Sequence, residues 1–368
     1  MMTHAKVAML TGIKTFEIKE FPIPEIKADE ILVKVEGCGV CGTDGHEYAR
    51  DPFGLIPFVP GHEGSGEIVK IGKNIKKDAA GKKIAVGDKL VTCIIPCGEC
   101  DSCINLPGRA NLCQNMGVSG LLPVDAYHFN GFFGEYIIIR KSASFFHVCA
   151  LSLDHRLLVE PAAVAIHAVE RAKSTGLINF STPVLIQGCG PIGLLVLAVL
   201  RTMGIENLIA VDGNESRLAL AQELGANETL NFSNFAGIEE ISKQVQEITG
   251  SDGAGFVFQC TGVPVAHANA WKLVKRGGGL CEVGFFMDGG TAVINPHFDL
   301  CAKEVTAVGS WVYTIQDYPI TFDFLKRAAG LALPLTKLIS HRYSLEEITE
   351  ALETNLAMTG IKVAIIND

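Results

Sequence analysis

The stretch from residue 184 to residue 212 constrains the fold of this chain more than any other. A short apolar run, VLIQ, ends where Gly188, Gly190 and Gly193 begin a GxGxxG pattern, and an apolar run of helix length follows. A second apolar run, LIAVD, closes the stretch at Asp212. This order predicts a strand, a tight turn, a helix and a second strand, which is the first unit of a doubly wound parallel α/β sheet.

Each glycine of the pattern meets a physical need of dinucleotide binding. Gly188 permits the tight turn, Gly190 lets the backbone approach a pyrophosphate, and Gly193 lets the helix pack on the strand. The helix N-terminus presents free N–H groups and a positive dipole end to the phosphates. A purely structural turn is the alternative, which the flanking strand and helix disfavour. The residues predicted to bind the dinucleotide here are Gly188, Gly190, Pro191, Ile192 and Gly193.

The acid that ends the second strand bears on which dinucleotide is bound. A carboxylate at Asp212 can accept hydrogen bonds from the adenosine ribose hydroxyls, and it would repel a 2′-phosphate. We therefore predict NAD rather than NADP as the cofactor. The neighbouring Arg217 is included among the cofactor residues and leaves NADP open.

Length and charge narrow the class of protein. A chain of 368 residues suits two domains with separate cores. Its formal net charge of −9 argues against a nucleic-acid surface. The apolar run 184–200 is short and contains glycines and a proline, so we expect it to be buried rather than to span a membrane. The N-terminal residues show no export signal, and we expect a cytoplasmic protein.

Four of the twelve cysteines are crowded into one short segment, a lobe at about 93–115. Cys97, Cys100, Cys103 and Cys113 can supply four thiolates that close a tetrahedral zinc site with no open position, which is a structural site. A redox CxxC pair, the alternative, would explain only two of them. The nearby Cys93 is interpreted as a buried residue of a strand.

Many short strands with Gly and Pro between them predict a β-rich, barrel-like first domain. It includes a strand at 30–36 and then a glycine-rich loop at 37–46. That loop carries several polar side chains and two thiols: Cys38, Cys41, Thr43, Asp44 and His46.

Beyond residue 212, helices and strands alternate to about residue 295, with helices expected at 238–249 and 264–275. The tail, with a helix at 317–330 and a capping box at Ser344 and Glu347, is expected to rejoin the first domain. The predicted domains are 1–155, 156–296 and 297–368.

Three residues from distant segments form a possible second metal site. Cys41, His62 and Glu160 would provide a thiolate, an imidazole and a carboxylate, which is a zinc site with a vacant fourth position. The residues alone leave this open, because a lone His is more often a packed residue. Glu160 would be costly to bury without a cation, although it could also be an ordinary carboxylate at a helix start.

Six motifs in a fixed order give the chain a family resemblance. They are CGVCGTDGH, GHEGSGEIVKIG, the four-cysteine segment, VEPAAVAIHA, GCGPIG and VD. Together they resemble the zinc-containing medium-chain alcohol dehydrogenases of the sorbitol and threonine dehydrogenase branch, over essentially the whole chain. The resemblance implies a GroES-like catalytic domain followed by a Rossmann domain that binds NAD.

The resemblance also implies roles for individual residues. Cys41, His62 and Glu160 would hold the catalytic zinc, and Glu63 would be able to approach it. Asp44 would orient the site's histidine, and Thr43 and His46 would relay the substrate's proton to solvent. Cys38 matches no ligand. The interval before Cys113 is slightly longer than the family's. By analogy the nicotinamide pocket is lined by Cys260, Thr261, Val283, Gly284 and Phe285.

The implied activity is hydride transfer between a secondary alcohol and NAD, with zinc as the Lewis acid. The substrate, a small molecule, would be a polyol, a diol or an amino alcohol such as threonine. Polar residues in loop 115–132 (Asp125, His128 and Asn130) suit a hydroxylated substrate, or are packing residues; loops 48–58 and 285–312 would add to the pocket. The alternatives are a zinc-free quinone or enoyl reductase, and a non-enzymatic nucleotide-binding protein. The family commonly forms dimers or tetramers.

Overall fold

The computed structural model describes residues 3–141 and 143–367, which form two compact units. Unit 1 comprises residues 1–160, 314–319 and 338–368, and unit 2 comprises residues 161–313 and 320–337. These boundaries differ from the predicted domains. The division falls after Glu160, and most of the segment 297–337 stays with unit 2, because a strand within it extends the sheet of that unit.

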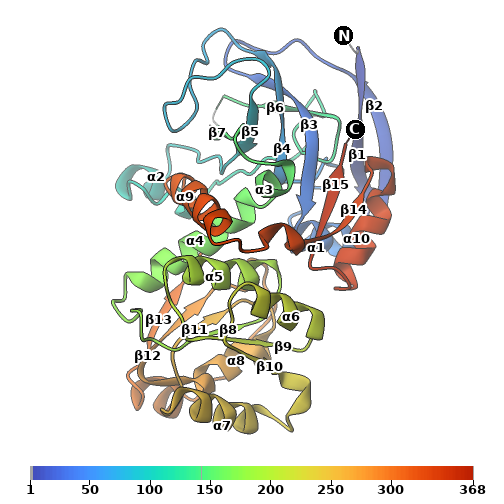
Figure 1. The fold of residues 1–368 in the computed structure, drawn as a ribbon. Coiled ribbons are helices and arrows are strands. Elements are labelled where there is room, and N and C mark those ends of the chain that lie inside the picture. The colour runs from blue at the N-terminus through green and yellow to red at the C-terminus, as the bar shows by residue number, and fades with distance from the viewer. Residues whose placement is uncertain (1–2, 142, 368) are drawn as a thin grey trace. The chain divides into compact units, whose positions relative to one another are not determined.

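Among the described residues of unit 2, six parallel strands form one sheet in the order β10-β9-β8-β11-β12-β13 (Figure 1). The side chains of β8 and β11 are buried along their whole length, as expected of central strands covered on both faces. The strands are β8 (Val184–Gln187), β9 (Leu208–Asp212), β10 (Glu228–Asn231), β11 (Ala254–Gln259), β12 (Val274–Glu282) and β13 (Thr306–Gly309).

Helices cover the two faces of this sheet, with α5 on one side and α7 and α8 on the other (Figure 1). The expected helix at 238–249 is α7, and the one at 264–275 ends at residue 273. The helices are α4 (Val159–Lys173), α5 (Pro191–Thr202), α6 (Glu215–Glu223), α7 (Ile238–Thr249), α8 (Pro264–Leu273) and α9 (Asp317–Gly330). The short turns are η2 (Phe232–Asn234), the π-helical η3 (Pro296–Cys301) and η4 (Leu335–Leu338).

The strand order of unit 2 reverses between β8 and β11. In an open parallel sheet, the loops after two such strands diverge and leave a crevice at their carboxyl ends, where ligands bind. The loop after β8 is the GxGxxG segment. The fold of unit 2 thus places the GxGxxG segment at this crevice, which is the position that a dinucleotide-binding loop needs.

Unit 1 is β-rich, as predicted. Within its described residues, a seven-stranded sheet runs β14-β15-β3-β4-β5-β7 with β6 on β3, and β1 pairs with β2 separately. The strands are β1 (His4–Gly12), β2 (Thr15–Pro22), β3 (Ile31–Val40), β4 (Glu63–Ile71), β5 (Lys89–Thr92), β6 (Tyr136–Ile139), β7 (Phe145–His147), β14 (Ile339–Tyr343) and β15 (Lys362–Ile366).

Short helices complete unit 1, and its main apolar core includes residues of β3, β15 and α10. The predicted capping box at Ser344 and Glu347 is present at the start of η5. The helices are α1 (Gly42–Arg50), α2 (Asp101–Asn105), η1 (Ala110–Leu112), α3 (Leu153–Leu157), η5 (Leu345–Glu347) and α10 (Ile348–Leu356). No helix in the described ranges is long and apolar enough to cross a membrane.

Candidate functional site

The predicted loop at 37–46 is instead the end of β3 followed by helix α1. Cys41 caps that helix: its backbone N–H donates to Asp44 Oδ2 (2.8 Å), and its side chain accepts from the third N–H of the helix. This reciprocal capping box satisfies two backbone groups that a helix start leaves open. The glycines suggested a loop, but the cap formed by Cys41 and Asp44 overrides them.

Three predicted metal-site residues come together at this helix start. Ligand atoms of Cys41, His62 and Glu63 lie within 4.8 Å of one another. His62 directly precedes β4, Glu63 is its first residue, and both are buried. Antiparallel pairing of β3 with β4 places Gly39 opposite Glu63, which brings Cys41, two residues further on, to the same end of the strands.

Asp44 lies beside the imidazole of His62, with 3.5 Å between Oδ1 and Nδ1. Burial lowers the pKa of His62, but the Asp44 carboxylate and the Cys41 thiol raise the pKa well above its usual range. The same contact can fix the orientation of the ring, which is the role predicted for Asp44.

Lys362, a residue that sequence reasoning missed, contacts this cluster through Glu63. Its Nζ forms a buried ion pair with both carboxylate oxygens of Glu63. Burial lowers the pKa of Lys362, but the charges of Glu63, Cys41 and Glu160 raise it, so the ammonium stays protonated. The only signal in the sequence is a lysine at the start of an apolar run, KVAII.

Gly39 makes room for this ion pair. A Cβ at Gly39 would lie 2.2 Å from Glu63 Oε2 and 3.0 Å from Lys362 Cε. A side chain on Gly39 would therefore displace a buried charged group, so the glycine is required by the ion pair rather than by the strand.

Glu160, the predicted third ligand, is the second residue of α4 and is half-buried. It is not among the described residues whose ligand atoms lie within 4.8 Å of one another at Cys41. Its charge nevertheless helps to raise the pKa values of Lys362 and of the buried Cys93. Glu160 is thus near the cluster, and its role as a zinc ligand stays a prediction.

The two predicted relay residues both lie on α1. Thr43 is buried, and its Oγ1 lies 3.7 Å from Cys41 Sγ. His46 is half-buried, with Arg50 Nη2 3.0 Å from its Nδ1. Burial and the Arg50 charge both lower the pKa of His46, which keeps its imidazole neutral near pH 7.

The donor set of this cluster fits a zinc ion. A thiol, an imidazole and a carboxylate are the groups that zinc prefers, and Glu160 adds a further acid nearby. If Cys41 is ionised, the thiolate and the carboxylates of Glu63, Glu160 and Asp44 outnumber the described cations of the cluster, Lys362 and a protonated His62. A divalent cation would offset that excess of negative charge.

The four thiols of the predicted lobe converge, and their role as zinc ligands stays a prediction. Within 4.8 Å of one another lie the Sγ atoms of Cys97, Cys100, Cys103 and Cys113, and all four are free thiols. Cys97 and Cys103 are 4.0 Å apart, and Cys100 and Cys113 are 3.9 Å apart. Zn–S bonds of about 2.3 Å imply sulfur–sulfur spacings of about 3.8 Å in a tetrahedral site. The lobe therefore fits a zinc ion. Cys93 and Cys38 are buried apart from it.

Backbone N–H groups prepare part of this lobe for a metal. N–H donors of Gln114 and Cys103 lower the pKa of Cys100 to about 6. Burial and the neighbouring thiols raise the pKa of Cys103 to about 12, so this thiol keeps its proton until a metal displaces it. Zinc binding should therefore release a proton here.

The structural reason for a glycine differs among the three positions of the GxGxxG segment. Gly188 has a φ of +92°, in the left-handed region that favours glycine. A Cβ on Gly193 would lie 1.8 Å from Gly188 O, so close packing excludes one. A Cβ on Gly190 would meet no atom within 4 Å. No contact in the described protein requires Gly190, so the space beside it is open for the predicted approach of a pyrophosphate.

Asp212 ends β9, as predicted, and faces the same loop. Its Oδ2 accepts from Cys189 N (2.7 Å) and its Oδ1 from Asn214 N (2.9 Å). A carboxylate has about four lone-pair sites, so it can still accept from ribose hydroxyls. Arg217 lies in the first turn of α6.

The loops predicted to line the nicotinamide pocket meet at the carboxyl ends of β11 and β12. A Cβ on Gly284 would lie 1.8 Å from Thr261 O, and one on Gly188 would lie 2.4 Å from Thr261 Cγ2. Sequence reasoning missed the polar network beneath them, in which Gln259 donates to Thr261 O (2.8 Å) and Glu282 accepts from Gly284 N (2.8 Å). Cys260, Val283 and Phe285 flank these contacts.

The polar residues of loop 115–132 hold the loop itself together. Asp125 Oδ1 accepts from the N–H groups of Tyr127 (2.8 Å) and His128 (3.1 Å). Asn130 Nδ2 donates to the carbonyl groups of residues 122 and 123. His128 stacks on Phe21. These contacts support the packing alternative, although Nδ1 of His128 and Oδ1 of Asn130 are buried without a hydrogen-bond partner among the described residues. Both readings of the loop stay open.

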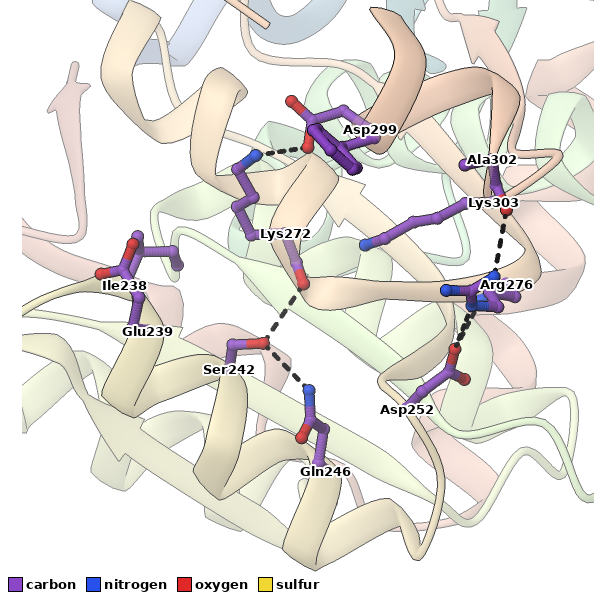
Figure 2. A pocket seen from close by; sticks show the side chains of 11 residues that line it. Ile238, Glu239, Ser242, Gln246, Asp252, Lys272, Arg276, Asp299, Ala302 and Lys303 are labelled. Carbon is purple, nitrogen blue, oxygen red and sulfur yellow. Dashed lines mark hydrogen bonds and ion pairs between the residues drawn. The ribbon is translucent and has the colours of Figure 1, made fainter. Parts of the chain in front are cut away.

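A cavity of about 480 Å³ lies at the opposite edge of the unit 2 sheet, by the amino ends of β11 and β12 (Figure 2). Its cations are already engaged: Lys272 pairs with Asp299, Arg276 Nε lies 3.6 Å from Asp252, and Lys303 donates to two carbonyls. We assign it no cofactor role.

Two family models match the chain. The family described as alcohol dehydrogenase GroES-like domain matches residues 27–148, and zinc-binding dehydrogenase matches residues 191–327. Sorbitol dehydrogenase of Bacillus subtilis (strain 168) is 31% identical over 364 residues, which cover 96% of each chain.

Solved structures agree with these matches. An alcohol dehydrogenase from Thermotoga maritima superposes with a TM-score of 0.91 at 30% identity, covering 99% of this chain and 100% of that one. A putative zinc-binding dehydrogenase from Sinorhizobium meliloti 1021, bound to NADP, has a TM-score of 0.84 at 28% identity and covers 100% of both chains.

Proposed function

This chain belongs to the zinc-containing medium-chain alcohol dehydrogenase family, in its polyol dehydrogenase branch, and we propose that it oxidises a hydroxylated secondary alcohol to the ketone with NAD as hydride acceptor. It is thus an alcohol dehydrogenase with zinc and nicotinamide cofactors; the substrate class and the residue roles are our proposal. The observation that carries the proposal is the convergence of Cys41, His62 and Glu63 at the start of α1.

Cys41, His62 and Glu160 would hold the catalytic zinc, with Glu63 kept beside it by Lys362. A zinc ion in such a site supplies Lewis-acid polarisation of the alcohol oxygen, which lowers the pKa of the hydroxyl. Asp44 would orient the imidazole of His62. The closed lobe, with its four thiols, would hold a second zinc ion with no position open for substrate.

The proton of the alcohol would leave through α1. The hydroxyl of Thr43 can accept a hydrogen bond from the substrate and donate one onward, which makes it a proton carrier. His46 would then take the proton toward solvent. Its lowered pKa suits this role, because only a neutral imidazole can accept a proton.

Unit 2 would hold the nicotinamide cofactor. Gly188, Gly190 and Gly193 would let the pyrophosphate lie on the N-terminus of α5, and Asp212 would bind the ribose. The loops containing Thr261 and Gly284 would support the nicotinamide ring. Asp212 favours NAD, whereas the relative from S. meliloti was solved with NADP, so both cofactors belong in the test.

The substrate class rests on similarity to sorbitol dehydrogenase, because Asp125 and the Asn130 amide nitrogen of loop 115–132 already bond to protein groups. A screen of NAD and NADP reduction with sorbitol, 2,3-butanediol, threonine and 2-propanol would test it. We expect a polyol, diol or amino alcohol to give the highest kcat/KM, with NAD preferred. Faster oxidation of 2-propanol than of every hydroxylated substrate would contradict the proposal.

Metal content separates this proposal from its alternatives. After removal of loosely bound metal, we expect about two zinc ions per chain, one for each cluster. A zinc-free chain that reduces quinones or enones with a nicotinamide cofactor would favour the reductase alternative. A chain that binds NAD without any turnover would favour the non-enzymatic one.

We also expect a homo-oligomer in the cytoplasm. β13 is the edge strand of the unit 2 sheet, and its residues are mostly exposed. An edge strand offers unpaired backbone groups to another chain. Analytical ultracentrifugation should show a dimer or tetramer; a monomer at micromolar concentration would contradict this expectation.

A further inference from the structure

A third group of potential metal ligands lies in unit 1, separate from both zinc clusters. Asp88 directly precedes β5, His147 ends β7, and Cys149 follows two residues later. β5 and β7 pair antiparallel with Leu90 opposite His147, so the sheet brings the three residues together. Their ligand atoms lie within 4.8 Å of one another.

The spacings in this group suit a tetrahedral ion. Asp88 Oδ1 lies 3.3 Å from His147 Nε2 and 3.6 Å from Cys149 Sγ. With Zn–N and Zn–O bonds of about 2.0–2.1 Å and a Zn–S bond of about 2.3 Å, a tetrahedral site separates N from O by about 3.3–3.4 Å and S from O by about 3.5 Å. As a hydrogen bond, by contrast, the 3.3 Å contact between His147 Nε2 and Asp88 Oδ1 is long.

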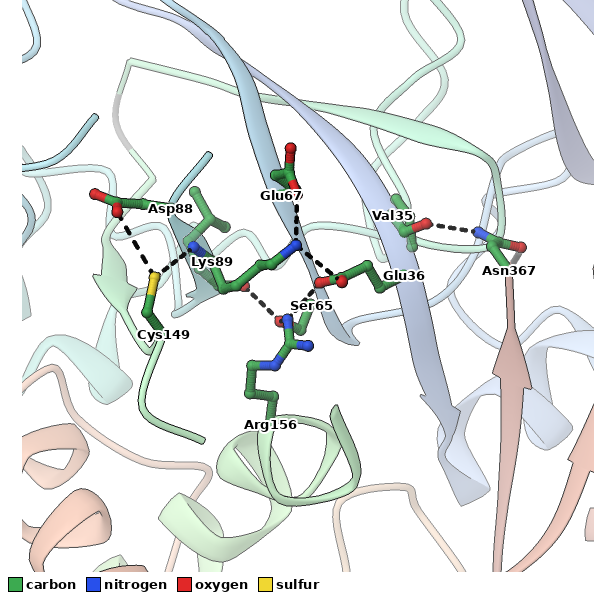
Figure 3. Close-up of polar contacts among 10 residues, drawn as sticks. Val35, Glu36, Ser65, Glu67, Asp88, Lys89, Cys149, Arg156 and Asn367 are labelled. Carbon is green, nitrogen blue, oxygen red and sulfur yellow. Dashed lines mark hydrogen bonds and ion pairs between the residues drawn. The ribbon is translucent and has the colours of Figure 1, made fainter. Parts of the chain in front are cut away.

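Backbone contacts hold all three residues in place. Asp88 Oδ2 accepts from Ala85 N (2.8 Å), which leaves Oδ1 for the group. The backbone N–H of Lys89 donates to Cys149 Sγ (3.0 Å), as Figure 3 shows. The N–H of His147 donates to Asp78 Oδ2 (2.9 Å). The four-cysteine lobe has a similar contact, in which Cys97 N donates to Cys113 Sγ (3.2 Å).

The group is open to solvent on one side. Cys149 is exposed, and the side chains of Asp88 and His147 are 25% and 11% exposed. Nδ1 of His147 is buried and bonds to no described residue, so no protein acceptor there decides which ring nitrogen carries the proton. An ion can therefore enter directly and keep a water molecule as its fourth ligand.

We propose that Asp88, His147 and Cys149 form a third zinc site, with a carboxylate, an imidazole and a thiolate as ligands and a fourth position for water. The ion would join the segment before β5 to the segment after β7. The site is independent of the proposed dehydrogenase chemistry, since none of its ligands belongs to the catalytic cluster.

Equilibrium dialysis of the zinc-loaded enzyme against added Zn²⁺ tests the site. The wild type should bind one zinc ion per chain more than the Cys149→Ser variant, and the Cys301→Ser variant should match the wild type. Cys301 is a suitable control because it is an exposed free thiol in unit 2. Turnover by Cys149→Ser should equal that of the wild type. Equal zinc binding by Cys149→Ser and the wild type would overturn the proposal.

Cobalt gives a second readout that identifies the ligands. Co²⁺ added to the zinc-loaded enzyme should produce a thiolate-to-cobalt charge-transfer band that Cys149→Ser lacks and Cys301→Ser keeps. In the His147→Gln and Asp88→Asn variants, the Co²⁺ affinity obtained by titrating this band should fall by tenfold or more. Losses of roughly 10–100-fold are usual when the surroundings of a metal site are altered. If both keep wild-type affinity, the thiol binds metal alone and the three-ligand site is wrong.

Discussion

The two predicted zinc clusters of unit 1 are built in opposite ways. The four thiols of the lobe come from residues 97–113, a single excursion of the chain. The cluster at Cys41 draws His62 and Glu63 from the start of β4 and Lys362 from β15, and Lys362 lies 299 residues from Glu63. The lobe is a local structure, whereas the second cluster exists only when three separated strands have paired.

This difference affects what each cluster can do. Four sulfur ligands fill a tetrahedral ion, so the lobe can only stabilise the fold around it. The Cys41 cluster mixes sulfur, nitrogen and oxygen donors and contains a buried cation. The protonation of its groups can therefore change when a ligand binds. Variants of the two clusters should therefore separate loss of turnover from loss of stability.

The largest effect on turnover is expected from the Cys41→Ser variant. Loss of several kcal/mol of Lewis-acid stabilisation corresponds to a decrease in kcat/KM of about 10³-fold or more. Glu160→Ala should act similarly if Glu160 is the third ligand. NAD affinity, measured by fluorescence titration, should change little. Full activity in either variant would refute the corresponding zinc assignment, and Cys301→Ser serves as the control.

The Lys362→Met variant should have the next largest effect. It leaves Glu63 buried without its partner, which costs roughly 3–5 kcal/mol of unfolding free energy. Zinc affinity and turnover should each decrease by about 10–100-fold, as they do when other residues that support metal ligands are replaced. Denaturant unfolding and zinc titration measure the two effects.

A second substitution sharpens that test. In the Lys362→Met background, Glu63→Gln removes the unpaired charge and should recover most of the lost stability. A double variant no more stable than Lys362→Met would show that the ion pair is not the cause.

A smaller effect is expected from Arg50→Met, and it concerns pH. Burial, and then the Arg50 charge, lower the pKa of His46, so the folded enzyme keeps a neutral imidazole at a lower pH than usual. Removing the Arg50 charge raises that pKa, so the acid-side decrease in kcat/KM for alcohol oxidation should begin at a higher pH. His46→Gln should abolish this decrease. An unchanged pH profile in Arg50→Met would remove His46 from the relay.

The Cys100→Ser variant should have the smallest effect on turnover per folded molecule. It should lose the zinc ion of the lobe and lower Tm by at least about 5 °C, given about 2–4 °C per kcal/mol in domains of 150–250 residues. The kcat of the protein that remains folded should stay close to that of the wild type. A loss of kcat as large as that of Cys41→Ser would mean that the lobe takes part in the chemistry.

The sequence predicts best those features whose residues are close together in the chain. The thiols of the lobe, the GxGxxG segment and the acid at Asp212 are each defined by short spacings, and the structure places them as expected. The helices at 238–249 and 317–330 follow from local periodicity.

Features that depend on tertiary pairing could not be predicted in this way. Lys362 lies in an apolar strand, and nothing in its neighbourhood indicates that Glu63 is its partner. The segment 37–46 was predicted as a loop because glycines dominate it, although the cap formed by Cys41 starts a helix. Asp125 and Asn130 were interpreted either as substrate-pocket or as packing residues, and only the structure shows that backbone groups of their own loop bond to Oδ1 of Asp125 and to Nδ2 of Asn130.

The distance along the chain between Glu63 and Lys362 has a consequence during synthesis. At about 5–20 residues per second, a ribosome needs roughly 15–60 s to travel from one codon to the other. Throughout that interval the carboxylate has no counter-ion and the thiol of Cys41 has no completed sheet to shelter it. A nascent chain held before residue 362 should thus leave Cys41 and Glu63 open to oxidants and chaperones, whereas Glu63 is buried in the finished enzyme.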